Sequence, residues 1–167
     1  IIFQRKENVM PDVDQLDENL QIESSIIEYC RSLTLLTLDE LINLYGQDLK
    51  NKQWVLEPLA DIVISLSVMH NGYCRYSQLK SGDHRYKMLP VLKVAISEHY
   101  DKLISKVKYI NCHIVDYMNF SSDKEKQDFC NLTNSNVVDL HYCVDKISLK
   151  NVICNEFYKN GKYYLNS

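Results

Sequence analysis

The chain contains little glycine and proline, with four and three residues respectively among 167. Few glycines and prolines mean few turns, so we expect long elements, which favour a helical bundle over a sandwich of many short strands. No apolar run reaches 18 residues, so the sequence predicts no membrane-spanning helix. The net charge of −3 offers no basic stripe of the kind that nucleic acid requires. The sequence therefore predicts an all-α protein that binds no nucleic acid.

Motifs that carry catalysis are absent from the chain as well. It has no G-x-S-x-G nucleophile elbow and no Glu-x-x-His pair of the kind found in metal-binding bundles. A loop that cradles phosphate needs clustered glycines, whereas Gly46, Gly72, Gly82 and Gly161 are widely separated. The sequence thus predicts no catalytic residue, no cofactor-binding residue and no metal ligand in this chain.

One pair of residues keeps a metal hypothesis open. His70 and Cys74 are four residues apart, so in a helix they share one face. Two ligands without further partners are a weak signal for zinc or iron, which require more donors. The alternative interpretation is that His70 is a core histidine on an apolar face.

Six cysteines are scattered along the chain with no C-x-x-C and no regular spacing. Cys30, Cys112 and Cys143 lie among apolar neighbours in stretches with a helical pattern, where a reduced cysteine behaves as a small hydrophobic residue. The pattern therefore predicts reduced cysteines and an intracellular protein.

Composition and length fit one globular domain. A hydrophobic content of 46% with 25% charged residues is ordinary for a folded domain and too apolar for a disordered chain. Residues 1–16 show no sustained period and predict an irregular leader or linker, whereas residues 17–167 predict a single helical bundle domain. Because the chain begins with Ile1 and not with Met, we expect a piece of a longer protein or a processed product.

The apolar periodicity predicts four or five helices, mainly antiparallel. We expect the first over 17–49, with Gly46 close to its end, and the second over about 51–79. The third follows the break at 81–83, holds Pro90 in its first turn and ends near Tyr117. A capping box at 122–125 predicts a short helix over 123–131, and the last helix is expected over 137–158.

The stretch Val55–Leu79 is the most apolar of these helices. Its predicted buried stripe recurs every three or four positions, at Leu59, Val63, Leu66 and Met69 or His70. Ile62, Ile64 and Val68 are apolar too, which predicts a central helix covered over most of its circumference, with the acid Asp61 set into its first half. Exposed apolar surface on either of the first two helices would instead favour a role in binding a partner.

Two residues disturb that helix. With Pro58, the helix either starts near Glu57 or runs from Asn51 with a kink, and the apolar Trp54 and Val55 favour the kinked alternative. Gly72 indicates either a close approach between helices or a bend.

A basic, tyrosine-rich stretch spans the end of the second helix and the start of the third. It suits contact with an anionic surface such as phospholipid head groups, or with an acidic partner. The alternative is a solvated helix end, where cations are favoured by the helix dipole. We call its five candidate residues the docking patch: Arg75, Tyr76, Lys80, Arg85 and Lys87.

The stretch from Ile26 to Leu79, above all WVLEPLADIVI at Trp54–Ile64, resembles the extra C-terminal helical domain of very-long-chain acyl-CoA dehydrogenases and of their complex I assembly paralogue. In that family an apolar Leu-Ala-Asp helix follows an amphipathic one. A short loop ending in an Asp-His-like pair comes next, matched by Asp83-His84, and then another helix, matched by Met88–Val107. The end of the chain, NGKYY at 160–164, is similar to the short tail after the family's final helix.

The resemblance implies a non-catalytic domain of a larger flavoprotein, an oxidoreductase that acts in fatty-acid β-oxidation or in complex I assembly. The family's flavin-binding and catalytic segments belong to an upstream core, so FAD is expected in the parent protein and no cofactor in this chain. The implied work is dimerisation and docking to a partner or to an anionic membrane surface, in the mitochondrial matrix or at the inner-membrane face. The alternative function is a free-standing helical adaptor that binds another protein.

Overall fold

The computed structural model describes residues 20–79, 82–117, 123–124, 142 and 144–160. Within this part of the chain lie four α-helices and one 3-10 helix, and no strand. The predicted all-α bundle is therefore confirmed. The leader expected at 1–16 lies outside the described residues, as do all but Asp123 and Lys124 of the helix expected at 123–131. Those two residues are helical.

The first helix, α1, spans Gln21–Tyr45 and ends where a glycine permits a left-handed backbone. Gly46 has a φ of 52°, a conformation in which side-chain-bearing residues are strained. The 3-10 helix η3 follows at Gly46–Asn51 and turns the chain into α2, which spans Gln53–Gln78. The position of Gly46 thus explains why α1 ends before residue 49.

The helix α2 begins before its proline, as the kinked alternative predicted. It starts at Gln53, so the buried Pro58 lies inside it. The Trp54 ring meets the Tyr45 ring edge-on at 6.4 Å and lies 6.0 Å from the His113 ring of α3. This aromatic cluster holds the first turn of α2 in place, although Pro58 cannot donate a backbone hydrogen bond.

The helix α3 spans Asp83–Tyr117 and also runs through a proline. Pro90 lies well inside it, so the prediction that Pro90 occupies the first turn was wrong. The helix starts earlier because the Tyr86 N–H donates to the Gly82 carbonyl at 3.3 Å and extends the first turn. The result is a helix of 35 residues, the longest of those described.

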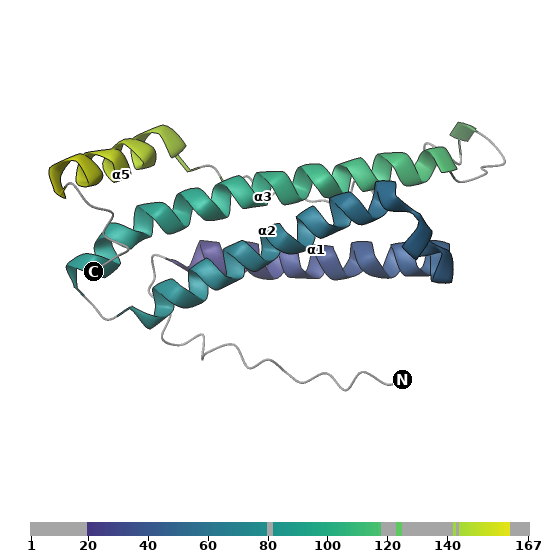
Figure 1. Ribbon diagram of the computed structural model, residues 1–167, viewed down its shortest axis with the longest axis horizontal. Coiled ribbons are helices and arrows are strands. Elements are labelled where there is room, and N and C mark those ends of the chain that lie inside the picture. Colours follow the sequence, from purple (N-terminus) through teal and green to yellow (C-terminus); the bar gives the residue numbers. More distant parts are fainter. Residues whose placement is uncertain (1–19, 80–81, 118–122, 125–141, 143, 161–167) are drawn as a thin grey trace.

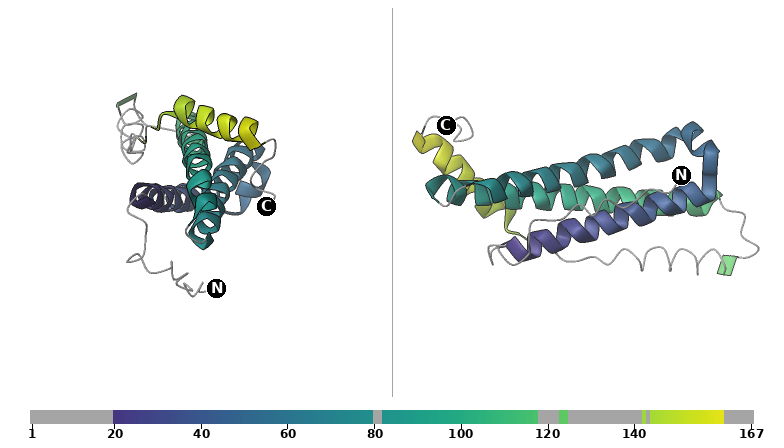
Figure 2. Two further views of the ribbon diagram at one scale, coloured as in Figure 1. Left: turned by 90° about the vertical axis from the view of Figure 1, so that its left-hand side faces the viewer. Right: turned by 90° about the horizontal axis from the view of Figure 1, so that it is seen from below.

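The helices α1, α2 and α3 form an up-down-up bundle, with α5 lying along the N-terminal half of α3 (Figure 1). The view along the bundle shows α5 on the outer side of α3, away from α1 and α2 (Figure 2). The most extensive interface joins α2 to α3, and α3 contacts α1, α2 and α5. The central helix is therefore α3, whereas the sequence had suggested α2.

The buried face of α2 differs from the predicted stripe. Its buried members are Val55, Pro58, Ile62, Ser65, Met69, Tyr73 and Tyr76. Small residues permit the close approach to α3: the Ser65 side chain is buried, and a Cβ added at Gly72 would lie 3.3 Å from Leu92 Cδ1. Met69 is buried as predicted, and Leu59 and Leu66 are partly buried against the core, but Val63 is exposed. Hydrophobicity alone does not select the buried face because that face mixes small, polar and aromatic residues. The expectation of a close approach at Gly72 was right.

The last described helix, α5, spans Lys146–Asn160 rather than 137–158. Asp145 caps it, because the Ser148 N–H donates to Asp145 Oδ1 at 3.0 Å and the Ser148 hydroxyl to Oδ2 at 2.7 Å. These hydrogen bonds lower the pKa of Asp145 below its ordinary value. Tyr142 and Val144 are not helical, so the helix begins at its cap.

The face of α5 that meets the bundle was also predicted wrongly. The apolar pattern of the sequence favours Ile147, with Asn151 or Cys154, as inward-facing residues of this helix, yet all three are exposed, Ile147 by 75%. Half-buried residues instead lie at the spacing of the opposite stripe, with Leu149 and Ile153 among them. Ion pairs from Lys146 and Lys150 to α3 fix the rotation of α5.

Candidate functional site

The docking patch lies where α2 ends and α3 begins. Tyr76 is buried, and the Arg85 guanidinium lies over its ring at 5.1 Å from the centroid, a cation–π geometry. Lys87 forms an ion pair with Glu156 of α5 at 3.4 Å. Arg75 is exposed, and Lys80 lies outside the described residues. The structure therefore places two of the five residues against each other and ties a third to α5, which leaves little of the patch available to an anionic surface.

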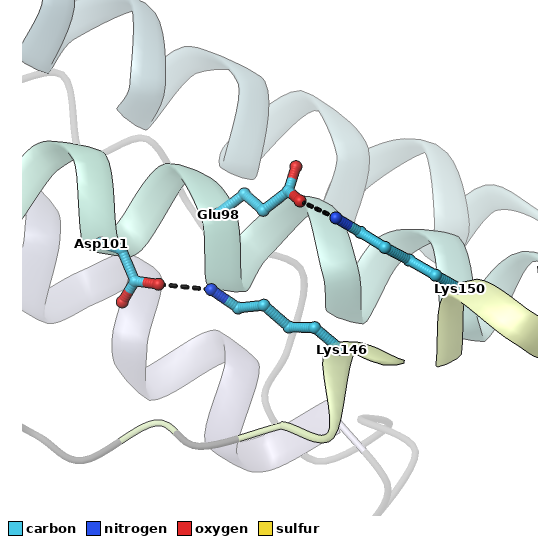
Figure 3. Close-up of polar contacts among 4 residues, drawn as sticks. All are labelled: Glu98, Asp101, Lys146 and Lys150. Carbon is cyan, nitrogen blue, oxygen red and sulfur yellow. Dashed lines mark hydrogen bonds and ion pairs between the residues drawn. The ribbon is translucent and has the colours of Figure 1, made fainter. Parts of the chain in front are cut away.

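Two further ion pairs fasten α5 to α3 (Figure 3). Lys150 Nζ donates to Glu98 Oε1 at 2.5 Å, and Lys146 Nζ donates to Asp101 Oδ2. The hydrogen bond from Lys150 lowers the pKa of Glu98 below its ordinary value. All four side chains are about one third to one half exposed. We call this set of four residues the charged clamp.

A buried carboxylate holds the chain just before α5. Glu23 of α1 is only 2% exposed, and its Oε1 accepts a hydrogen bond from the Tyr142 hydroxyl at 2.8 Å. Lys93 Nζ of α3 lies 3.6 Å from the same oxygen. The Tyr142 ring meets the Tyr100 ring edge-on at 6.5 Å. Burial, together with the hydrogen bond to Glu23, raises the pKa of the Tyr142 hydroxyl, which therefore stays protonated and donates.

Ion pairs and half-buried side chains, Leu149 and Ile153 among them, attach α5 to the bundle. None of its described side chains belongs to the apolar core, whereas Tyr142 packs against that core. Exposed ion pairs contribute about 0.2–1 kcal/mol each, so the three pairs to α5 together supply at most about 3 kcal/mol. Among the described contacts of this region, the one between Tyr142 and Glu23 enters the interior.

His70 and Cys74 are in contact, but the hydrogen bonds of the His70 ring oppose metal binding. Arg31 Nη2 lies 3.3 Å from His70 Nδ1, and Cys74 Sγ lies 3.6 Å from Nε2. A guanidinium only donates, so Nδ1 accepts and the ring proton sits on Nε2, pointing at sulfur. A metal would need the Nε2 lone pair that this proton occupies. Moreover, the described residues hold no group of three or more His, Cys, Asp and Glu side chains that could bind a metal ion.

The described cysteines are unpaired thiols, including the buried Cys30. Burial raises the pKa of the Cys30 thiol to about 12, so it remains protonated and behaves as a small hydrophobic residue. This agrees with the interpretation of Cys30 from the sequence.

Aliphatic residues on one face of α1 and one face of α2 form a set that we call the aliphatic seam. The contact between Arg31 and His70 joins these two faces, since the α1 members follow Arg31 and the α2 members precede His70 at spacings of three or four. Three of them are about half exposed, with values of 59% for Leu35, 49% for Ile42 and 48% for Val63. The full seam comprises Leu35, Leu38, Ile42, Leu59, Val63 and Leu66.

The seam faces away from α3. Asp61 of α2 accepts hydrogen bonds from Lys102 and Lys106 of α3, both at 2.9 Å. Asp61 and Val63 are two residues apart, which separates their directions by about 200° around the helix. Since Asp61 points to α3, Val63 and the seam point outward on the other side. Asp61 is thus paired with two lysines at the edge of the α2–α3 interface and not deep inside it.

Sequence analysis missed Glu23 and the charged clamp. Nothing in the sequence marks Glu23 as buried, because its partners Tyr142 and Lys93 are 119 and 70 positions away. The clamp had a weak signal, since Lys146 and Lys150 are spaced to share a helix face. That signal does not identify the partner helix.

No known relative guides the assignment. Comparison of this chain with protein-family models, with curated proteins and with solved structures finds no match. The functional argument therefore rests on the residues themselves and on the resemblance described above.

Proposed function

We propose that this chain is a non-catalytic C-terminal helical domain of an acyl-CoA dehydrogenase-like flavoprotein, of the kind that acts in fatty-acid β-oxidation or in complex I assembly. Its work is docking: the domain pairs with a second copy of itself and provides a surface for partner proteins. FAD belongs to the parent protein, and the proposal places the parent in the mitochondrial matrix or at the inner-membrane face.

The aliphatic seam is the observation that carries the proposal. Leu59, Val63 and Leu66 form the stripe that the periodicity predicted to be buried, yet Val63 is half exposed. Leu35 and Ile42 of α1 are also about half exposed. Large apolar side chains exposed together on a folded protein are typical of a site that binds another protein. We infer that the stripe becomes fully buried only when a partner covers the seam.

The order of elements supports the family assignment. The Leu-Ala-Asp stretch lies within one continuous helix, α2, and the next helix, α3, begins at the Asp83-His84 pair. Both helices continue through their prolines, Pro58 and Pro90, without a break. A long apolar helix, a short loop and a second long helix are what the resemblance requires.

Contact with a membrane has less support than contact with a protein. None of the described helices is both long and apolar enough to cross a bilayer. A peripheral contact would rely on the docking patch, where Tyr76 is buried and Lys87 already pairs with Glu156. We therefore propose protein docking as the main role and keep the anionic membrane surface as a secondary one.

Sedimentation equilibrium of the 167-residue chain tests the docking role. We expect a reversible dimer whose dissociation constant rises at least tenfold when Leu35→Lys and Val63→Lys are combined. The matched control combines Ser32→Lys and Asn71→Lys, two exposed positions off the seam, and should leave the constant unchanged. A chain that stays monomeric at every concentration, or a dimer equally weakened by both pairs, would contradict the proposal.

The alternative function, a free-standing adaptor, shares the same seam. The two functions differ in what precedes this segment in the gene. A flavin-binding core in the same reading frame, and a flavin absorption spectrum from the protein purified from its source, would support the flavoprotein. A start codon immediately before Ile1 would support the adaptor.

A further inference from the structure

A cysteine, a histidine and an arginine meet where α2 lies beside α1. His70 Nε2 is 3.6 Å from Cys74 Sγ, and both residues are partly exposed to solvent. We infer that Cys74 is a reactive thiol, which the His70 ring and the Arg31 guanidinium prepare for exchange with small anionic disulfides. This site uses no member of the aliphatic seam, so the inference does not depend on the proposed function.

The direction of the hydrogen bonds prepares the sulfur. Arg31 Nη2 donates to His70 Nδ1 across 3.3 Å, so the ring proton sits on Nε2 and points at Cys74 Sγ. An anionic sulfur accepts from such a donor more strongly than a neutral thiol does. Because the thiolate is the nucleophilic form of cysteine, the His70 proton favours the form that reacts. A nucleophile, an imidazole in contact with it and a third group that orients the imidazole are the parts of an activated nucleophile.

Positive charge around the thiol selects the reagent. Arg31 also pairs with Glu28 through Nη1, at 3.3 Å, and its side chain remains 31% exposed. Arg75, the next residue of α2 after Cys74, is exposed as well. Cations beside a nucleophile raise the local concentration of anionic reagents. The class of reagent that fits is therefore a small disulfide bearing carboxylates.

The exchange balances with the disulfide as its one co-reactant. The Cys74 thiolate attacks one sulfur of the disulfide, so that a new S–S bond forms while the original S–S bond breaks. The second sulfur leaves as a thiolate and takes up the proton that Cys74 released to solvent. The Cys74 sulfur is oxidised and the leaving sulfur is reduced, which leaves half of the reagent attached to Cys74 as a mixed disulfide.

The test incubates the 167-residue chain with glutathione disulfide and follows each cysteine by peptide mass spectrometry. We expect Cys74 to form the mixed disulfide at least tenfold faster than the exposed Cys154, and His70→Leu to remove this advantage. Arg31→Met should remove it too, because the ring proton can then move to Nδ1, whereas Arg31→Lys keeps a cationic donor and should retain most of it. Buried Cys30 reports on folding, since it stays unmodified in a variant whose bundle is intact.

A neutral reagent, bis(hydroxyethyl) disulfide, supplies the charge control. The preference for glutathione disulfide over this reagent should be larger at Cys74 than at Cys154. A rate at Cys74 no higher than that at Cys154, an advantage that survives His70→Leu, or the same reagent preference at both cysteines would overturn the inference. The two wild-type comparisons decide the matter even where a variant fails to fold.

Discussion

Replacing Tyr142 with phenylalanine removes one hydroxyl and tests whether a buried carboxylate anchors α5 to the bundle. In the structure this hydroxyl donates to Glu23 Oε1 at 2.8 Å, and Lys93 is the other described group close to that oxygen, at 3.6 Å. Because Glu23 is 2% exposed, water cannot readily replace the lost donor. Among the residues that the structure describes, the substitution therefore leaves Glu23 Oε1 with Lys93 as its partner, 3.6 Å away.

The size of the effect follows from that burial. A hydrogen bond to a charged group contributes about 1.5–3 kcal/mol, and a buried acceptor that loses its donor also bears a desolvation cost. We expect Tyr142→Phe to lower the free energy of unfolding by about 2 kcal/mol. With a urea m-value of about 2 kcal/mol/M, the unfolding midpoint should move down by about 1 M. The aromatic contact between residue 142 and Tyr100 does not need the hydroxyl and is retained.

Urea denaturation followed by far-UV circular dichroism measures this loss. The matched control is Tyr158→Phe, which removes a hydroxyl from an 80% exposed ring and should shift the free energy by less than about 0.5 kcal/mol. Glu23→Gln combined with Tyr142→Phe completes a double-mutant cycle, in which the coupling energy should exceed about 1 kcal/mol. If Tyr142→Phe behaves like the control, the carboxylate is not desolvated and the anchoring role is wrong.

Three further outcomes are expected. Hydrogen bonds from Lys102 and Lys106 lower the pKa of Asp61, so the stability that they supply is present above the ordinary carboxyl pKa and is lost as pH falls through the lowered value. Asp61→Asn should therefore reduce the loss of stability at acid pH, as denaturation curves measured from pH 7 to pH 2 can show. Gly72→Ala should change the free energy of unfolding by less than about 1 kcal/mol, because the gain in helix propensity offsets a tight contact with the flexible end of Leu92. Gly72→Leu should lower the free energy of unfolding by about 2 kcal/mol, because the larger side chain does not fit against Leu92. Iodoacetamide should label Cys154 in the native protein and label Cys30 only in urea, as peptide mass spectrometry can show, because Cys30 is buried and its pKa is raised to about 12.

Long helices were predictable because local chemistry specifies them. Gly46 ends α1 by adopting a positive φ, and the apolar Trp54 and Val55 indicated that α2 begins before Pro58. The start of α5 was missed, although the Asp145–Ser148 cap is a local signal that the sequence already contained. Pro90 was placed in a first turn by general preference, which the continuous helix from Asp83 overrides.

The rotation of each helix was less predictable than its extent. On α2 the periodicity favoured the stripe with Leu59 and Val63, while the structure buries Ser65 and lets Gly72 approach Leu92. The choice between these faces depends on how closely α3 can pack, a property of two helices together. For the same reason the burial of Glu23, whose partners are distant in sequence, could not be read from its neighbours.

Salt should act in opposite directions on the aliphatic seam and on the charged clamp, because their chemistry differs. The seam around Val63 is aliphatic, and excluded salts such as sulfate strengthen the burial of apolar surface. The contact of Lys150 with Glu98 is an exposed ion pair, and the screening length falls from about 10 Å at 0.1 M to about 3 Å at 1 M ionic strength. The two surfaces lie on opposite sides of the bundle, since Asp61 directs the seam away from α3 while α5 covers the outer side of α3 (Figure 2). A dimer that tightens with added salt therefore uses the seam, whereas the amides of α5 should lose protection from hydrogen exchange as salt screens the charged clamp.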